Sequence, residues 1–366
     1  MKNNTLIQIH ELGQSVWLDF FDRKIMDTGK LKTLIDKDAI GGLTSNPSIF
    51  EKAIRTSSDY DEDIAAHSQQ KSTNDDIFYG LAIKDIRRAA DLFKPLFDRT
   101  NGEDGLVSLE VSHRLAYDTE GTIKQARELW TLTDRENVMI KIPGTLEGLP
   151  AIRKCISEGI NINITLLFGL QRYLQVTSAY LAGLQDRLKA HKPIDRITSV
   201  ASFFLSRIDA RCDPILEEKG LGKLKGEVAI ASAKMAYAMY KTVFTREPFT
   251  ELETKGAKRQ HLLWASTSTK DPSFSDVKYV EGLIGKDTIN TITIETLEAF
   301  RDHGQAVTHL EDGLTKAGGI LTQLKKKGID INIITQELED DGIRKFNQAY
   351  DEILEAVKSK RSKQLI

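Results

Sequence analysis

The stretch NVMIKIPGT, residues 137–145, has the features of a short buried strand, with one exception. It is apolar over 138–142 apart from Lys141, and a proline and a glycine end it. Full burial of an unpaired charge costs several kcal/mol, so a lysine in such a strand needs either an ion-pair partner or a functional role. The fold around the stretch shows which of these is expected.

Similar β-rich runs recur along the chain and alternate with stretches of helical apolar spacing. The eight runs are 15–20, 40–46, 105–111, 137–142, 160–168, 197–204, 261–267 and 288–294. Helical spacing appears between them at 77–97, 121–133, 147–157, 169–188 and 223–244. This alternation predicts a parallel sheet, and eight units favour a closed (β/α)8 TIM barrel over an open doubly wound sheet.

Helices beyond the barrel's own are expected at about 47–100, 205–245 and 305–360. The last predicted helix, from about 335 to 360, has one apolar side and is expected to pack on the barrel. That side carries Leu338, Ile343, Phe346, Tyr350, Ile353, Leu354 and Val357. Since no low-complexity linker interrupts the pattern, we expect residues 1–366 to form a single domain.

Composition excludes several classes of partner. The chain has 366 residues, 40% of them hydrophobic, and its net charge of -2 gives no reason to expect nucleic acid or an anionic membrane. It lacks a signal-peptide pattern and an apolar run of roughly 20 residues, so we expect a cytoplasmic protein. Cys155 and Cys212 are too few for a disulfide framework, and the histidines show no metal-binding spacing, so no metal is expected.

Polar residues within the predicted strands carry the functional information, because the strands of a parallel barrel are covered on both faces. These residues are Asp19, Thr44, Asn46, Glu110, Lys141, Asn163, Thr165, Ser202 and Ser266. Nearly all fall near the carboxyl ends of their strands, where barrel active sites are built. Thr44 and Asn46 are two residues apart and face the same way, as are Asn163 and Thr165. The pattern predicts one polar pocket.

Each of these residues also has a structural interpretation. A strand-end aspartate or asparagine often caps the next helix, and serine or threonine is an ordinary strand residue. Glu110 and Lys141 are harder to explain in this way, although they could form a buried ion pair.

The functional interpretation uses the cost of burial. Desolvation favours a neutral lysine, which can attack a carbonyl and form a Schiff base, although nearby carboxylates oppose that shift. Schiff-base chemistry needs protons moved, and Asp19 and Glu110 supply carboxyl groups for this. Small polar side chains such as Thr165 could hold a catalytic water and sugar hydroxyls. The set fits a reaction of the class I aldolase type.

Five motifs also carry a family resemblance in chain order. They are GLTSNPSIFEKAI (42–54), VSLEVSHRLAYDT (107–119), VMIKIPGTLEGLPAI (138–152), ININITLLFGLQRY (160–173) and LWASTSTKDP (263–272). Together they resemble the transaldolase family over most of the chain. The resemblance implies a (β/α)8 barrel that needs no cofactor and no metal. It also implies transfer of a dihydroxyacetone unit from sedoheptulose 7-phosphate or fructose 6-phosphate to glyceraldehyde 3-phosphate or erythrose 4-phosphate, in the pentose phosphate pathway.

The resemblance implies a role for each matching residue. Lys141 matches the Schiff-base lysine, Asp19 the acid/base aspartate, Glu110 the glutamate that acts through a water, and Thr165 the threonine that helps to hold this water. The residues that match substrate-binding positions are Thr44, Asn46, Asn163, Ser202, Phe204 and Arg207, with Arg207 as a phosphate anchor. Ser266 is expected to join them from the seventh strand.

The phosphate site departs from the family pattern. Many members resemble ASFR after the seventh strand, with an arginine on the phosphate, whereas this chain reads ASTSTK over 265–270. Ser268 stands at the arginine's place, and we hypothesise that Lys270 replaces it as a point charge. The alternative is a solvated loop lysine. His113, where many relatives have proline, is given no catalytic role.

Two other functions remain open. A fructose 6-phosphate aldolase resembles a transaldolase but releases free dihydroxyacetone; its members are much shorter, with glutamine and tyrosine where this chain has Glu110 and Phe204. A sugar-phosphate-binding barrel without catalysis would lose Lys141, Glu110 and Asp19, all of which are present. In each case the expected partners are small sugar phosphates, with the chain a monomer or a homodimer.

Overall fold

The computed structural model describes residues 4–69 and 72–363, which form a closed barrel of eight parallel strands in chain order. The strands are β1 (Gln14–Asp19), β2 (Ile40–Thr44), β3 (Leu106–Glu110), β4 (Val138–Pro143), β5 (Ile162–Leu167), β6 (Ser199–Phe204), β7 (His261–Ala265) and β8 (Thr288–Ile292). All eight coincide with the predicted runs, and pairing of β8 with β1 closes the sheet. The predicted (β/α)8 fold is confirmed.

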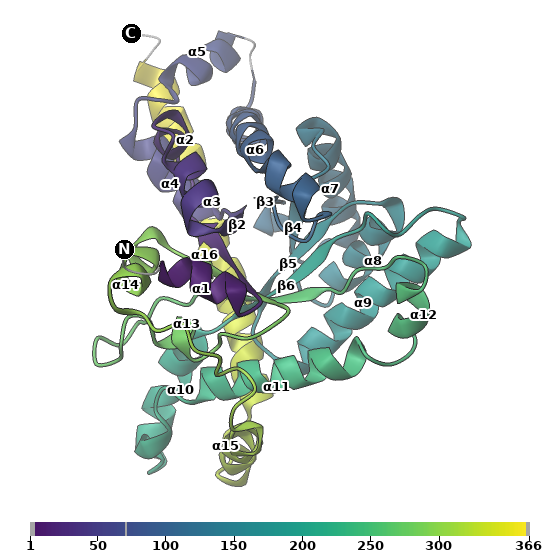
Figure 1. The fold of residues 1–366 in the computed structure, drawn as a ribbon. Helices are drawn as coiled ribbons and strands as arrows, with labels where there is room; N and C mark the ends of the chain where they lie inside the picture. Colours follow the sequence, from purple (N-terminus) through teal and green to yellow (C-terminus); the bar gives the residue numbers. More distant parts are fainter. Residues whose placement is uncertain (1–3, 70–71, 364–366) are drawn as a thin grey trace.

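Helices surround the strands, as Figure 1 shows. Before β5 they are α1 (Thr5–Glu11), α2 (Arg23–Asp27), α3 (Lys30–Asp38), α4 (Pro47–Thr56), α5 (Asp61–Gln69), α6 (Asn74–Arg99), the 3₁₀ turn η1 (His113–Leu115), α7 (Thr119–Thr133) and α8 (Gly148–Glu158). From β5 on they are α9 (Leu170–Lys189), α10 (Ser206–Glu218), the 3₁₀ turn η2 (Gly222–Leu224), α11 (Val228–Val243), α12 (Phe249–Glu253), α13 (Lys278–Glu281), α14 (Ile294–His303), α15 (Leu314–Lys326) and α16 (Ile331–Lys363). None of the described helices is both long and apolar enough to cross a membrane.

Four strands are followed by more than one α-helix. These are β1, with α2 and α3; β2, with α4 to α6; β6, with α10 to α12; and β8, with α14 to α16. The segment GLGKLKG forms the turn η2 with its flanks, between α10 and α11. These insertions leave the barrel intact because each enters and leaves at the ends of strands.

The C-terminal helix α16 packs along α4 and also contacts α6, α10, η1 and β5. In Figure 1 it is the long yellow helix beside the barrel. The predicted apolar side is buried at six of its seven positions, and only Leu354 is partly exposed. Burial of that side is the reason a helix rich in charged residues stays on the barrel.

Close approach of α16 to β5 occurs at Gly342. A methyl group at this position would lie 2.9 Å from Cδ2 of Leu166. Leu166 itself has a φ of 60°, in the left-handed region that a leucine rarely adopts, and the register of β5 against β6 shifts between Ile164 and Leu167. The end of β5 is therefore an irregular strand supported by the helix.

A polar contact fastens the start of α16 to the barrel. Arg172 of α9 lies with Nη1 3.5 Å from Oε2 of Glu339 and also donates to the carbonyl of Gly144 at 2.8 Å. Burial raises the pKa of Glu339 to about 7, although Arg172 acts in the opposite direction. Glu339 is therefore partly protonated near neutral pH.

Truncation of the buried side of α16 should destabilise the protein. Ile353 is fully buried, whereas Ile333 of the same helix is 60% exposed. We expect Ile353→Ala to lower the free energy of unfolding by ~2–5 kcal/mol through lost contacts and a cavity. Ile333→Ala, as the matched control, should change it by less than ~0.5 kcal/mol. Urea unfolding measures both, and equal effects would contradict the packing described.

Glu339 should make stability depend on pH. Its folded pKa of about 7 lies above the ordinary 4.5, so the folded state binds the proton more tightly. The contribution of Glu339 to the free energy of unfolding therefore falls as the pH rises from about 4.5 to 7. Glu339→Gln should remove this loss and raise the free energy of unfolding at pH 8 by up to ~3 kcal/mol. A parallel decline in wild type and variant between these pH values would exclude Glu339 as the cause.

Candidate active site

A row of polar side chains crosses three neighbouring strands inside the barrel. Glu110 of β3 is in register with Lys141 of β4, and Lys141 with Asn163 of β5. Residues in register on parallel strands point to the same face, so one inward row carries a carboxylate, an amine and an amide. The Lys141 and Glu110 residues are only 5% and 8% exposed.

Lys141 and Glu110 form an ion pair, which the sequence left as an open alternative. The ammonium of Lys141 also donates to the carbonyl oxygen of Ser45 at 3.0 Å. Burial raises the pKa of the Glu110 carboxyl, while Lys141 opposes that rise. A carboxyl held next to an amine in this way is placed to accept its proton.

Asp19 stands at the end of β1, beside the row. Thr44 donates its hydroxyl proton to Oδ1 of Asp19 at 3.1 Å, and its own oxygen lies 2.7 Å from that of Thr291 on β8. Burial raises the pKa of Asp19, although Lys141 opposes the rise. The hydrogen bonds from Thr44 and Asn46 also act to lower this pKa.

These side chains surround a cavity of about 230 Å³ at the barrel mouth. Nine of the predicted site residues line it: Asp19, Thr44, Asn46, Lys141, Ser202, Phe204, Arg207, Ser266 and Lys270. The structure therefore brings together residues from five strands or the segments that directly follow them, β1, β2, β4, β6 and β7. A small polar molecule in this cavity would touch both the amine of Lys141 and the carboxyl of Asp19.

The other three predicted residues lie behind the lining. Glu110 does not line the cavity itself but forms an ion pair with Lys141, which does. Asn163 donates to Ser108 at 3.0 Å and accepts from Ser202 at 2.7 Å, so it fixes a side chain of the cavity wall. Thr165 is fully buried, and its hydroxyl has no hydrogen-bond partner among the described residues. A buried hydroxyl without a partner is a place for an ordered water.

Asn46 has both of the functions that the sequence left open. Its side-chain oxygen accepts from the backbone N–H of Ile49 at 3.1 Å and so caps α4, which begins at Pro47. Its side chain also lines the cavity. The cap uses the oxygen and leaves the amide nitrogen for polar groups in the cavity.

Two cations lie at one end of the cavity. The guanidinium of Arg207 is 5.8 Å from the ring centres of both Phe204 and Phe346, and burial lowers its pKa. Partial burial and repulsion from Arg207 lower the pKa of Lys270. Within the residues that the structure describes, neither cation has an ion-pair partner, so this end of the cavity suits an anion.

Sequence reasoning missed several lining residues. They are Ser48, Ala265, Thr267, Thr291, Thr293 and Phe346; Ser268, noted for its place in the seventh loop, also lines the cavity. Thr291 and Thr293 are two residues apart at the end of the eighth run, the same signal that pointed to Thr44 and Asn46. Phe346 gave no such signal, because helical spacing marked it only as apolar.

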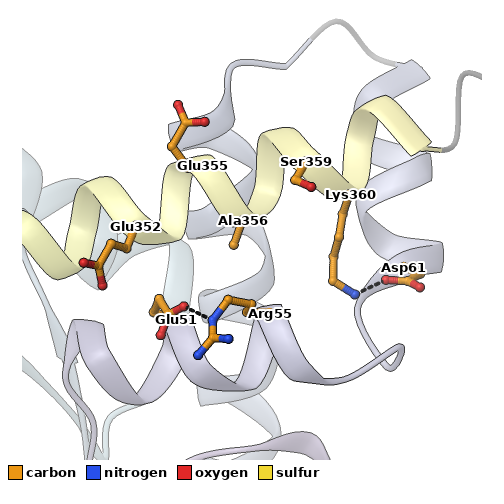
Figure 2. A pocket seen from close by; sticks show the side chains of 8 residues that line it. All are labelled: Glu51, Arg55, Asp61, Glu352, Glu355, Ala356, Ser359 and Lys360. Atoms are coloured by element: carbon orange, nitrogen blue, oxygen red, sulfur yellow. Dashed lines mark hydrogen bonds and ion pairs between the residues drawn. The ribbon is translucent and has the colours of Figure 1, made fainter.

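A larger hollow of about 660 Å³ lies between α4 and α16, as Figure 2 shows. Four of its charged side chains pair with each other, Glu51 with Arg55 at 2.5 Å and Lys360 with Asp61. None of the predicted site residues lines it. Among the described residues no group of three or more histidine, cysteine or acidic side chains could hold a metal ion. The smaller cavity in the barrel is the candidate active site.

Comparison with known proteins assigns the chain to a family. The model of the transaldolase/fructose-6-phosphate aldolase family matches residues 16–357. A transaldolase of Trichodesmium erythraeum is 44% identical, with 99% of both chains covered. Transaldolase 2 of a Nostoc species is 45% identical over 98% of both, and a Thiobacillus denitrificans transaldolase is 43% identical over 96% of this chain and 99% of the relative. These relatives confirm the expected enzyme class, a transferase. The chain therefore belongs to the transaldolase family.

Proposed function

We propose that the protein transfers a dihydroxyacetone unit between sugar phosphates through a Schiff base on Lys141. The donors are ketose phosphates, sedoheptulose 7-phosphate or fructose 6-phosphate. The acceptors are aldose phosphates, glyceraldehyde 3-phosphate or erythrose 4-phosphate. The observation that carries the proposal is a buried lysine that is paired with one carboxylate and shares an open cavity with a second.

Formation of the Schiff base begins with proton transfer from Lys141 to Glu110, its ion-pair partner. The neutral amine attacks the C2 carbonyl of the ketose and gives a carbinolamine. Loss of water, assisted by the proton now on Glu110, leaves a protonated imine. The positive imine nitrogen then draws electrons from the neighbouring carbon–carbon bond.

Bond cleavage follows at Asp19. Its carboxylate takes the proton of the C4 hydroxyl, the bond between C3 and C4 breaks, and an aldose phosphate leaves. The three-carbon unit remains on Lys141 as an enamine. Addition of this enamine to the aldehyde of the acceptor reverses these steps, and Asp19 returns its proton to the new hydroxyl.

Water for the carbinolamine steps is held between Glu110 and Thr165 in this proposal. The hydroxyl of Thr165 is buried and lacks a partner among the residues described, which supports a water at this place. Thr44, Asn46, Asn163 and Ser202 then hold the sugar hydroxyls. Phe204 and Ser266 complete the wall of the cavity.

The phosphate group binds between Arg207 and Lys270. Both line the cavity, and the mutual repulsion of the two cations is relieved when a dianion lies between them. Lys270 thus takes the place of the arginine that is common in the family. As a point charge it attracts the phosphate without fixing two oxygens at once.

A fructose 6-phosphate aldolase would share the Schiff base but release free dihydroxyacetone. The relatives that match nearly the whole chain are named transaldolases, which favours transfer over release. A binding barrel without catalysis does not account for an amine and two carboxyl groups at one cavity.

Borohydride reduction in the presence of fructose 6-phosphate should freeze a three-carbon adduct on Lys141. Peptide mapping by mass spectrometry locates it. We expect no adduct in Lys141→Ala and a fall in kcat of about 10⁴-fold or more. Lys154→Ala, which removes an exposed lysine, should behave as wild type. Free dihydroxyacetone should be nearly absent until an aldehyde acceptor is added. A folded wild type without an adduct would make the pair with Glu110 purely structural.

Removal of Lys270 should weaken phosphate binding. We expect Lys270→Ala to raise KM for fructose 6-phosphate about tenfold, with kcat little changed, because a charge-assisted contact is lost equally from substrate and transition state. Lys223→Ala removes an exposed lysine outside the cavity and should leave KM unchanged. Steady-state kinetics measure KM and kcat for each variant. An unchanged KM in Lys270→Ala would contradict the role of Lys270 and leave Arg207 as the phosphate anchor.

A further inference from the structure

His113 is buried beside the candidate site, in the segment that follows β3. It opens the turn η1, three residues after Glu110, and is 2% exposed. Its ring meets that of Phe346 edge to face, with centres 4.7 Å apart. The histidine is thus held between the strand that carries Glu110 and the helix α16.

The two ring nitrogens differ in their surroundings. Nδ1 lies 3.8 Å from Oε2 of Glu110, whereas Nε2 is buried without a hydrogen-bond partner among the described residues. Burial, with a smaller effect of Lys141, lowers the pKa of His113 to about 3, so the ring is neutral under assay conditions. A neutral ring carries one proton, which the Glu110 carboxylate draws to Nδ1 because a lone pair there would repel it.

The distance of 3.8 Å between Nδ1 and Oε2 is too long for a hydrogen bond. Glu110 is held away from His113 because its other oxygen, Oε1, forms the ion pair with Lys141. Once Lys141 is bonded to substrate, its nitrogen has fewer N–H groups and this hold weakens. Oε2 then needs another donor, and the Nδ1–H of His113 faces it.

We propose that His113 is a positioning residue that holds Glu110 through Nδ1–H while Lys141 carries the substrate. The inference rests on the Schiff-base function proposed above and adds a residue to it. His113 touches no substrate; it keeps the carboxyl of Glu110 aimed at the water that enters and leaves the carbinolamine. Its contact with Phe346 fixes the ring for this purpose.

Two substitutions separate positioning from packing. His113→Phe keeps an aromatic ring against Phe346 and removes the N–H, whereas His113→Asn restores a side-chain N–H near the place of Nδ1. His261→Phe is the matched control, because it removes a histidine 3.1 Å from Glu103 at the opposite end of the barrel. The readouts are kcat and KM for fructose 6-phosphate transfer, the midpoint of thermal unfolding and the borohydride adduct.

We expect His113→Phe to lower kcat about tenfold with KM unchanged, because the variant lacks one hydrogen bond to the charged Glu110. His113→Asn should regain kcat to within about threefold of wild type, and His261→Phe should affect unfolding alone. The adduct on Lys141 should persist in all three. A wild-type kcat in His113→Phe, or no recovery in His113→Asn, would reduce His113 to core packing. Absence of the adduct from wild type would overturn the Schiff-base proposal as well.

Discussion

Two opposite charges, Lys141 and Glu110, meet inside a barrel whose strands are otherwise largely apolar. Burial of either charge alone would be unfavourable, because only the attraction of the opposite charge offsets the free energy lost with its hydration. The pair also limits the chemistry: a reaction that consumes the charge of Lys141 leaves the carboxyl of Glu110 without its partner.

Much of the fold was predictable, because its elements leave local signals. Apolar runs of strand length alternated with helical spacing, and the eight runs found by that criterion are the eight strands. The site was partly predictable for the same reason. A charge such as Lys141 is conspicuous in an apolar strand, and the barrel topology brings all strand ends to one mouth. That topology makes β3 and β4 neighbours, and their register then sets Lys141 beside Glu110.

What the sequence could not reveal depends on contacts between distant segments. Thr291 reads as an ordinary strand threonine, and only closure of β8 on β1 and β2 shows that it reaches Thr44. Phe346 lies on an apolar helix side whose partner is unknown until α16 is docked. The burial of His113 leaves no signal in the sequence, because local spacing contains no information on it. In each case the missing quantity is a tertiary distance, which composition and periodicity do not encode.

Gly342 gives the last helix a connection to the irregular end of β5. A methyl group at Gly342 would fit against this strand end only if the side chain of Leu166 moved, and Leu166 directly follows Thr165. A shift of α16 by one residue would bring Asp341 or Ile343 against that strand end. A substitution at Gly342 therefore acts on the helix and on the strand end together. The C-terminal helix is tied to the geometry of the barrel mouth, and insertions are better tolerated on the outer loops than near position 342.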